Sequence, residues 1–182
     1  MKTRPTRLTT KRLCLREPRF SDWPWIHEYA SDPRFVRYVV WGPNTESQTK
    51  AFLKNCLLQQ KKKPRSRYDW VIEEKTSGKV VGMCGFTVVS TKDREGGAMG
   101  YGVNRTVWGR GYTTEAAKAM IHFGFQKLGL RRITSTCDVK NKASARVMEK
   151  AGMKREGLFR KNVFQKGKWR DTFFYAILKH KR

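Results

Sequence analysis

The sequence predicts a single α/β domain in which helices flank a mixed, mostly antiparallel sheet. Runs of alternating apolar and polar residues, typical of strands, recur along the chain, and helix-start signals stand between several of them. Between Gly100 and Gly152 the expected order is strand, glycine turn, helix, strand, helix. With 182 residues, 38% of them hydrophobic, the chain can bury one core and is short for two. We therefore expect one domain over residues 1–182, with its core at about 10–178.

The first elements are a strand and a helix. Alternation over residues 12–16 predicts the strand. Ser21-Asp22, followed by Pro24, is typical of a helix start, because Ser and Asp cap helices and Pro suits the first turn. This helix should run to about residue 30.

A second helix should begin at a capping box. Thr45 and Gln48 have the spacing at which each side chain bonds the other's backbone amide. The helix should run through residue 57 or 58 and present Phe52 and Leu53 to the core. A basic stretch broken by proline, residues 61–67, follows as a loop.

Three strands should form the middle of the sheet. Residues 68–74 and 80–89 flank a hairpin-like turn at 76–79. A charged loop, residues 91–96, leads to a strand at 98–103 that contains two glycines. Glycine inside a strand often marks a place where something approaches the backbone closely.

The turn after this strand, Trp108-Gly109-Arg110-Gly111-Tyr112-Thr113-Thr114, is the most informative stretch of the chain. Its paired glycines can adopt backbone conformations closed to other residues. A helix starting at Thr113 or Thr114 leaves its first amide hydrogens unpaired, and these point outward with the positive end of the helix dipole. That arrangement suits a phosphate, and Arg110 adds a charge. A tight connection without a ligand is the alternative interpretation.

The last part of the chain should complete the sheet. The helix after the glycine turn has an apolar face and ends at Leu128-Gly129. The remaining elements are expected to be a strand at 133–139, a helix from Asn141 to Ala151-Gly152, and a hairpin of residues 153–164 and 169–178 that turns at 166–168.

Seven short phrases stand in a fixed order along these elements: Arg12-Leu13-Cys14-Leu15-Arg16, Gly100-Tyr101, Trp108-Gly109-Arg110-Gly111-Tyr112 with Thr114-Glu115-Ala116, Asn141-Lys142-Ala143-Ser144, Glu149-Lys150-Ala151-Gly152-Met153, Glu156-Gly157 and Gly167-Lys168-Trp169-Arg170-Asp171. The series resembles the GNAT acetyltransferase superfamily, and its RimJ/RimL-type branch in particular, from about Thr10 to Leu178. The resemblance implies a GNAT-like fold, acetyl-coenzyme A (acetyl-CoA) as cofactor, and acetyl transfer to a primary amine.

The resemblance also implies where the cofactor binds. The family motif Q/R-x-x-G-x-G/A, which wraps the pyrophosphate, falls on Trp108, Gly109, Arg110, Gly111, Tyr112 and Thr113. Trp108 and Thr113 depart from the general pattern, but Trp is usual in the RimJ/RimL-like branch, and the backbone amides as far as Thr114 serve whatever the side chains are. Pantetheine in this family lies along the preceding strand, here beside backbone groups of Met99, Tyr101 and Val103. For the side chains of Met99 and Tyr101, core packing is the favoured interpretation.

Acetyl transfer requires a neutral amine, a donor for the developing oxyanion and an acid for the departing thiolate. Many superfamily members carry a tyrosine acid seven residues after the asparagine that corresponds to Asn141, but this chain has Met148 there, which cannot donate a proton. In the RimJ/RimL-like branch the suggested acid is a serine, here Ser144. Asn141 either bonds pantetheine or caps the following helix, and Ser144 is either the acid or structural.

The general base stays open. Glu95 in the charged loop and Asp138 at a strand end are acids near the expected cleft, Glu156 could instead fix the last hairpin, and a water relay would also suffice. The three histidines form no catalytic set, and we assign no metal site.

The charge is unusual, since 40 Lys and Arg residues against 15 Asp and Glu residues give +25. A magnitude of about 2 to 8 is comfortable for a small domain. The basic residues are dense in two regions: Lys54, Lys61, Lys62, Lys63, Arg65 and Arg67, and Lys154, Arg155, Arg160, Lys161, Lys166, Lys168 and Arg170. Contact with RNA or the ribosome and a merely solvated basic exterior are both open interpretations, because no recognised nucleic-acid motif accompanies the charge.

Two function classes follow. The first is an N-acetyltransferase for an amine-bearing substrate, with a peptide N-terminus or ribosomal protein favoured over polyamines, amino acids and aminoglycosides. The second is a non-catalytic nucleic-acid or ribosome-binding module on the same fold. No apolar run suits a membrane span or a signal peptide, and four cysteines without metal-type spacing suggest buried reduced thiols. We expect a cytoplasmic monomer or homodimer with no membrane partner.

Overall fold

The computed structural model describes residues 6–91 and 94–179. Four helices accompany one sheet: α1 (Trp23–Ala30), α2 (Glu46–Gln60), α3 (Tyr112–Gln126) and α4 (Lys142–Lys150), with 3-10 turns η1 (Phe20–Asp22), η2 (Val36–Tyr38) and η3 (Arg105–Val107). The strands are β1 (Arg7–Thr9), β2 (Leu13–Arg16), β3 (Arg67–Glu74), β4 (Val80–Thr91), β5 (Arg94–Val103), β6 (Arg132–Asp138), β7 (Lys154–Gln165) and β8 (Lys168–Leu178). Their order in the sheet is β1-β2-β3-β4-β5-β6-β8-β7, and every pairing is antiparallel except β5 with β6. The predicted fold class is confirmed.

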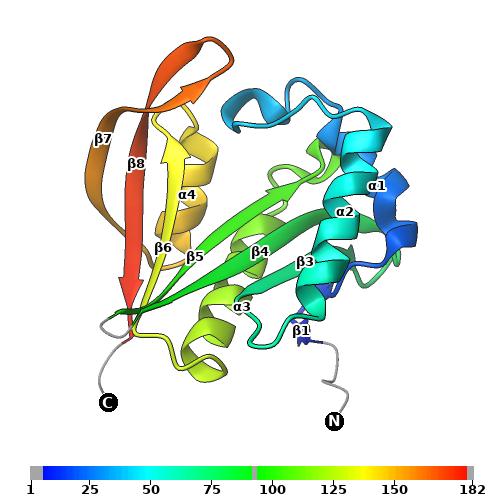
Figure 1. Ribbon diagram of the computed structural model, residues 1–182, viewed down its shortest axis with the longest axis horizontal. Helices are drawn as coiled ribbons and strands as arrows, with labels where there is room; N and C mark the ends of the chain where they lie inside the picture. Colours follow the sequence, from blue (N-terminus) through cyan, green and yellow to red (C-terminus); the bar gives the residue numbers. More distant parts are fainter. Residues whose placement is uncertain (1–5, 92–93, 180–182) are drawn as a thin grey trace.

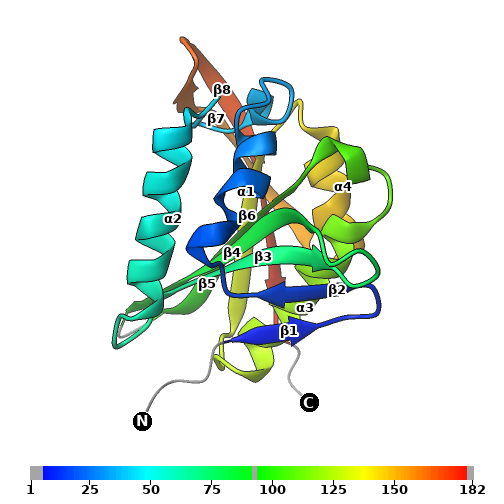
Figure 2. The ribbon, with the colours of Figure 1, turned by 90° about the vertical axis from the view of Figure 1, so that its right-hand side faces the viewer.

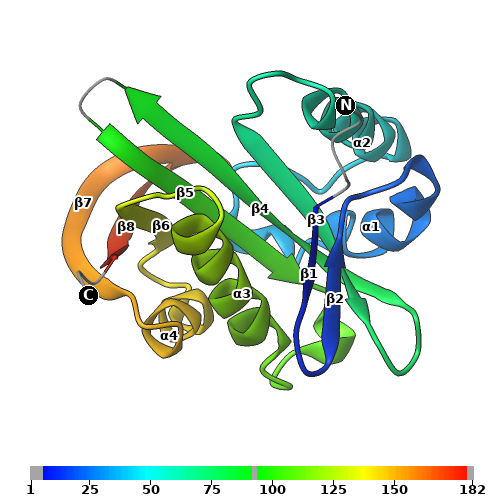
Figure 3. The same ribbon diagram turned by 90° about the horizontal axis from the view of Figure 1, so that it is seen from below.

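Helices cover both faces of the sheet, α1 and α2 on one and α3 and α4 on the other (Figures 2 and 3). Alternate residues of β3 face opposite sides of the sheet. Val71 packs with Ile26 of α1 and Leu53 of α2, whereas Trp70 belongs to the larger core that contains Met120 of α3. This double burial explains why the middle of β3 is a continuous apolar run and does not alternate.

The parallel pair β5 and β6 opens into a fork. The two strands pair only over Gly96–Ala98 and Arg132–Thr134. Beyond these residues they diverge (Figure 1), and at the point of divergence the hydroxyl of Ser135 donates to the carbonyl of Met99 at 2.9 Å. One edge of β5 is therefore unpaired with β6 from Gly100 onward.

Most predicted elements are confirmed, including the Thr45–Gln48 capping box of α2 and the last hairpin. The prediction of a charged loop at 91–96 was wrong, because β4 and β5 pair as far as Thr91 with Arg94. The core contact of Phe52 was also wrong: this side chain is 37% exposed, and α2 buries Thr49, Leu53 and Cys56 instead. The short edge strand β1 was not expected at all.

All four cysteines are free and buried, as the sequence indicated. None of the helices in the described ranges combines the length and apolarity that a membrane span requires.

Candidate active site

The glycine turn lies at the N-terminus of α3. Gly109 and Gly111 have φ angles of 77° and 76°, in the left-handed region that side chains disfavour. Gly111 is the residue before the first turn of α3, so the amides that follow it have no intrahelical partners. A Cβ on Gly109 would meet nothing within 4 Å. The turn therefore offers an open row of donors at the positive end of a helix, which is the geometry of an anion site.

Arg12 fixes this turn from the far end of the sequence. Its Nη1 donates to the carbonyl of Arg110 at 2.8 Å, and its Nε donates to Glu115 at 2.7 Å. The Thr10 hydroxyl donates to the same carboxylate at 2.6 Å, and the Arg12 guanidinium stacks on Tyr112 at 4.6 Å. Partial burial raises the pKa of Glu115, but the hydrogen bonds from Thr10 and Arg12 outweigh this effect and hold the pKa below its usual value. Glu115 is thus ionised but paired, and its charge does not oppose an anion at the turn.

The free edge of β5 continues this site. Odd-numbered residues turn their backbone groups toward β6, since the carbonyls of Gly97 and Met99 accept hydrogen bonds from Thr134 and Ser135. The carbonyl of Val103 accepts from the Trp108 indole at 2.9 Å. By the same alternation, the amide and carbonyl of Tyr101 face the open fork. The side chains of Met99 and Val103 are buried, and that of Tyr101 packs against the core, in line with the packing interpretation.

The candidate acid lies across the fork on α4. The Asn141 side chain caps α4 by accepting from the Ser144 amide at 3.1 Å. The Ser144 hydroxyl lies 3.3 Å from the hydroxyl of Tyr101, a contact that sequence spacing did not reveal. Met148, at the usual tyrosine position, is fully buried in the core. A neutral hydroxyl pair, Ser144 with Tyr101, therefore stands at the cleft where a proton donor is needed.

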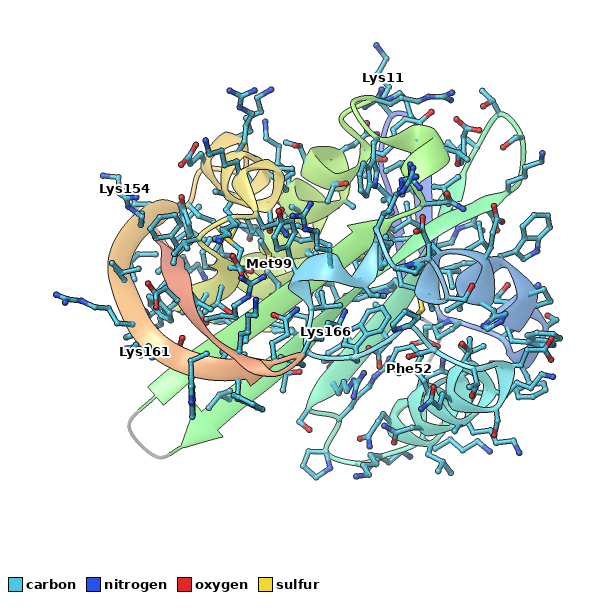
Figure 4. All side chains as sticks on the ribbon, turned by 90° about the horizontal axis from the view of Figure 1, so that it is seen from above. Lys11, Phe52, Met99, Lys154, Lys161 and Lys166 are labelled. Carbon is cyan, nitrogen blue, oxygen red and sulfur yellow. The ribbon has the colours of Figure 1, made fainter. Side chains whose placement is uncertain are left out.

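These parts line one cleft of about 1690 Å³ that passes from the α3–α4 side of the sheet to the α1–α2 side. A bridge joins η2, next to the cleft-lining residues Tyr38 and Val39, to the tip of the β7–β8 hairpin. Gln165 donates to the carbonyls of Arg37 and Val39 at 3.0 and 2.8 Å, and the Lys166 ammonium donates to that of Val36 at 2.6 Å. Figure 4 views this bridge from above, with Lys166 labelled beside η2.

The acetyltransferase (GNAT) domain family matches residues 12–154 of the chain. The chain belongs to the GNAT acetyltransferase family. It is 37% identical to the uncharacterized N-acetyltransferase YnaD of Bacillus subtilis (strain 168), over 94% of this chain and 96% of YnaD. A GNAT acetyltransferase from Bacillus anthracis superposes with a TM-score of 0.82 at 31% identity, covering 95% and 98% of the two chains. The ribosomal alpha-N-protein acetyltransferase RimL, solved with coenzyme A, shares the fold with a TM-score of 0.84 at 17% identity, over 95% and 98% of the chains.

This GNAT chain is accordingly an N-acetyltransferase, and acetyl-CoA is its cosubstrate. The residues present suit that group. The open glycine turn matches a pyrophosphate and the unpaired edge of β5 matches the amide-bearing pantetheine arm, whereas the predicted contact residue Arg110 does not line the cleft.

The three candidates for the general base lie in different surroundings. Glu95 lies in β5 opposite Ser90, before the strands fork, and its side chain is outside the described residues. Asp138 pairs with Arg170 at 3.2 Å and does not line the cleft. Glu156 pairs with Arg132 and ties β7 to β6, which is the structural alternative. Within the described ranges no group of three or more His, Cys, Asp or Glu side chains is placed to hold a metal ion.

Two thiols line the cleft, those of Cys84 and Cys137. Burial, and then the charge of Asp69, raises the pKa of Cys84, and burial raises the pKa of Cys137 to about 11. Neutral thiols are poor nucleophiles. Burial thus leaves both thiols poorly suited to act as nucleophiles.

A second side of the cleft was missed by the sequence reasoning. It is formed by Phe35, Trp41, Asp69 and Gly85, on the face covered by α1 and α2. Asp69 could have indicated this side of the cleft, because it is an acid beside the apolar run of β3. Burying a charge is costly, and buried acids are common at functional sites.

Proposed function

We propose that this acetyltransferase modifies the α-amino group of a peptide or protein N-terminus, with a ribosomal protein as the favoured class. The observation that supports this proposal is the charge of the side chains that line the cleft. Its charged lining residues are basic at Arg34, Arg67, Lys142, Arg146, Lys150 and Arg155 and acidic only at Asp69 and Glu149. Glu149 already accepts a hydrogen bond from Tyr175 at 2.9 Å. A polyamine with several positive charges is repelled by such a lining, whereas a peptide N-terminus carries one.

The family resemblance supports the same class. RimL is named for a ribosomal protein substrate, and the seven phrases of the RimJ/RimL-type branch all occur in this chain. A spermidine N-acetyltransferase from Vibrio cholerae shares the fold equally well, with a TM-score of 0.79 at 17% identity. Fold likeness therefore does not choose between the acceptors, and the charge of the cleft carries the choice.

Several groups of the chain would take part in acetyl transfer. Acetyl-CoA, when bound, supplies an acetyl group activated as a thioester. The amides from Gly109 to Thr114 would hold the pyrophosphate, and the free edge of β5 at Tyr101, between Met99 and Val103, would align pantetheine and polarise the carbonyl oxygen. As the C–N bond forms and the C–S bond breaks, Ser144 would give its proton to the departing sulfur and regain one from the attacking amine, directly or through water.

A thiol-release assay with acetyl-CoA tests the acceptor. We expect peptides with a free N-terminus to exceed spermidine in kcat/KM by at least tenfold, which corresponds to roughly 1.4 kcal/mol. The same peptides with a blocked N-terminus are the matched control and should release no thiol. Fastest turnover with spermidine, an aminoglycoside or a free amino acid would overturn the peptide assignment.

The β7–β8 hairpin favours RNA or ribosome contact as a second property. Six of its basic side chains are exposed and three exposed aromatic rings stand among them: Lys154, Arg155, Arg160, Lys161, Lys166 and Lys168, with Phe159, Phe164 and Trp169. Cations with exposed rings suit a phosphate backbone and unstacked bases. In the other dense region Arg65 pairs with Glu17 and Arg67 with Asp69, which leaves Lys54, Lys61, Lys62 and Lys63 exposed.

Two triple variants with equal charge change test this surface. Replacing Arg160, Lys161 and Lys168 by Gln should flatten the slope of log K against log salt for a single-stranded RNA by roughly 2 to 3, because each lost phosphate contact removes about 0.7 to 0.9. Replacing Lys61, Lys62 and Lys63 by Gln should leave it unchanged. Fluorescence anisotropy at three salt concentrations measures both. Equal slopes in all three proteins would mean that the basic exterior is only solvated.

We also propose that the enzyme works in the cytoplasm. Support comes from the four buried, unpaired cysteines, since proteins of oxidising compartments commonly form disulfides.

A further inference from the structure

Asp69 is a buried carboxylate that the proposed transfer does not use. It lies in the middle of β3 and is 5% exposed. Arg67 contacts it through Nε alone, 3.1 Å from Oδ1 and 2.9 Å from Oδ2. No well-directed hydrogen bond reaches Oδ2, which is itself buried. Since a carboxylate offers about four acceptor positions, Asp69 retains unused capacity for a donor.

A glycine trough leads from Asp69 toward the fork. Asp69 pairs with Gly85 of β4, and Gly85 pairs with Gly100 of β5, so the three residues form one rung and point to the same face. A Cβ on Gly85 would lie 3.0 Å from Asp69 Oδ1, and a Cβ on Gly100 would meet nothing within 4 Å. The two glycines therefore leave the carboxylate uncovered along a path to the free edge of β5.

The trough lies on the α1–α2 side of the cleft. Asp69, Gly85 and Gly100 all line that cleft, on the face covered by α1 and α2. Phe35 packs over Gly102, its ring within 2.6 Å of the position that a Cβ would take, and lies 6.1 Å from the ring of Trp41. Aromatic faces attract cations. A group held there would have a carboxylate at one end and aromatic rings beside it.

We propose that Asp69 binds the ammonium group of the acceptor. An ammonium at Oδ1 would lie above Gly85, about one strand spacing, or roughly 5 Å, from Gly100 and the thioester expected beside it. Arg67 keeps the carboxylate oriented and gives Oδ1 one N–H, so Oδ1 keeps a second acceptor position for the ammonium. A single carboxylate also matches a single positive charge. The inference rests on the N-acetyltransferase activity and holds for any primary amine, so it does not depend on the acceptor being a peptide.

Binding, without turnover, tests the proposal. The probe is 4-fluorobenzylammonium, with 4-fluorobenzyl alcohol as its uncharged counterpart, titrated by fluorine NMR into the protein saturated with coenzyme A. The wild type should prefer the ammonium over the alcohol. Asp69→Asn should weaken ammonium binding by about tenfold, the usual effect of losing one charged hydrogen bond, and leave alcohol and coenzyme A affinities within about twofold.

Asp138→Asn is the matched control. Asp138 is also 5% exposed, also pairs with an arginine and also has a buried Oδ2 without a hydrogen bond, but it does not line the cleft. It should leave all three affinities unchanged.

Gly85→Ala provides a second test that keeps the charge. Its methyl group would cover Asp69 Oδ1, so it should weaken ammonium binding as Asp69→Asn does, and it decides the matter if Asp69→Asn fails to fold. Equal wild-type affinity for the ammonium and the alcohol, or full ammonium affinity in a folded Asp69→Asn or Gly85→Ala variant, would overturn the proposal. A failed peptide panel with intact Asp69-dependent binding would count against the peptide assignment alone.

Discussion

Ser144→Ala is expected to lower turnover by about 100-fold while acetyl-CoA affinity stays within a few-fold. The hydroxyl lies at the cleft, 3.3 Å from that of Tyr101, and Met148 at the usual acid position has no proton to give. Losing the donor should slow departure of the thiolate without removing a contact to the pyrophosphate. Steady-state kinetics with the best acceptor, together with calorimetry of acetyl-CoA binding, measures the two effects.

Ser47→Ala is the control for this substitution. Ser47 is an exposed serine of α2 that does not line the large cleft, so its variant should behave as the wild type. Near-normal turnover of Ser144→Ala would mean that the hydroxyl only packs against Tyr101 and that water protonates the thiolate.

Gly111→Val should raise the Kd for acetyl-CoA at least tenfold, or roughly 1.4 kcal/mol. Gly111 has φ at 76°, which a β-branched residue strongly disfavours, so the turn must change shape to accept valine. A Cβ there would also lie 3.6 Å from Nη2 of Arg12, the side chain that holds the carbonyl of Arg110. The contact with Arg12 is an ordinary one, so the change in the shape of the turn is what would misplace the amides at the start of α3.

Gly167→Val separates binding from backbone strain. Gly167 has the same φ of 76°, and a Cβ there would meet nothing within 4 Å, but it lies in the β7–β8 turn and does not line the cleft. Its variant should lose similar stability and keep acetyl-CoA affinity in a calorimetric titration. Unchanged affinity of folded Gly111→Val would contradict an anion site at the turn.

Local signals in the sequence predicted the parts of the fold that depend on neighbouring residues. The Thr45–Gln48 box and the turn at 166–168 formed as expected, because caps and tight turns are decided within a few residues. The side of α2 that meets the sheet depends instead on how the helix docks, so Phe52 was placed wrongly. A three-residue polar edge strand such as β1 has too little pattern to be recognised.

The candidate site, like the fold, was predictable only where it depends on neighbouring residues. The glycine turn could be placed from its residues and from the family resemblance. The contact between Arg12 and Glu115 joins positions 103 residues apart, and both were known only as parts of separate phrases. The rung of Asp69, Gly85 and Gly100 depends on the register of three strands, which no local signal in this chain specifies.

The bridge between η2 and the β7–β8 hairpin bears on how the enzyme folds during synthesis. Its hydrogen bonds join residues 126 to 130 positions apart, so they depend on loop closure over most of the chain. Such non-local contacts form slowly and late. A chain emerging from the ribosome can complete α1 and α2 early, but this bridge cannot form until the last hairpin has been made. We therefore expect the segment around η2 to reach its final arrangement only after most of the chain has been synthesised.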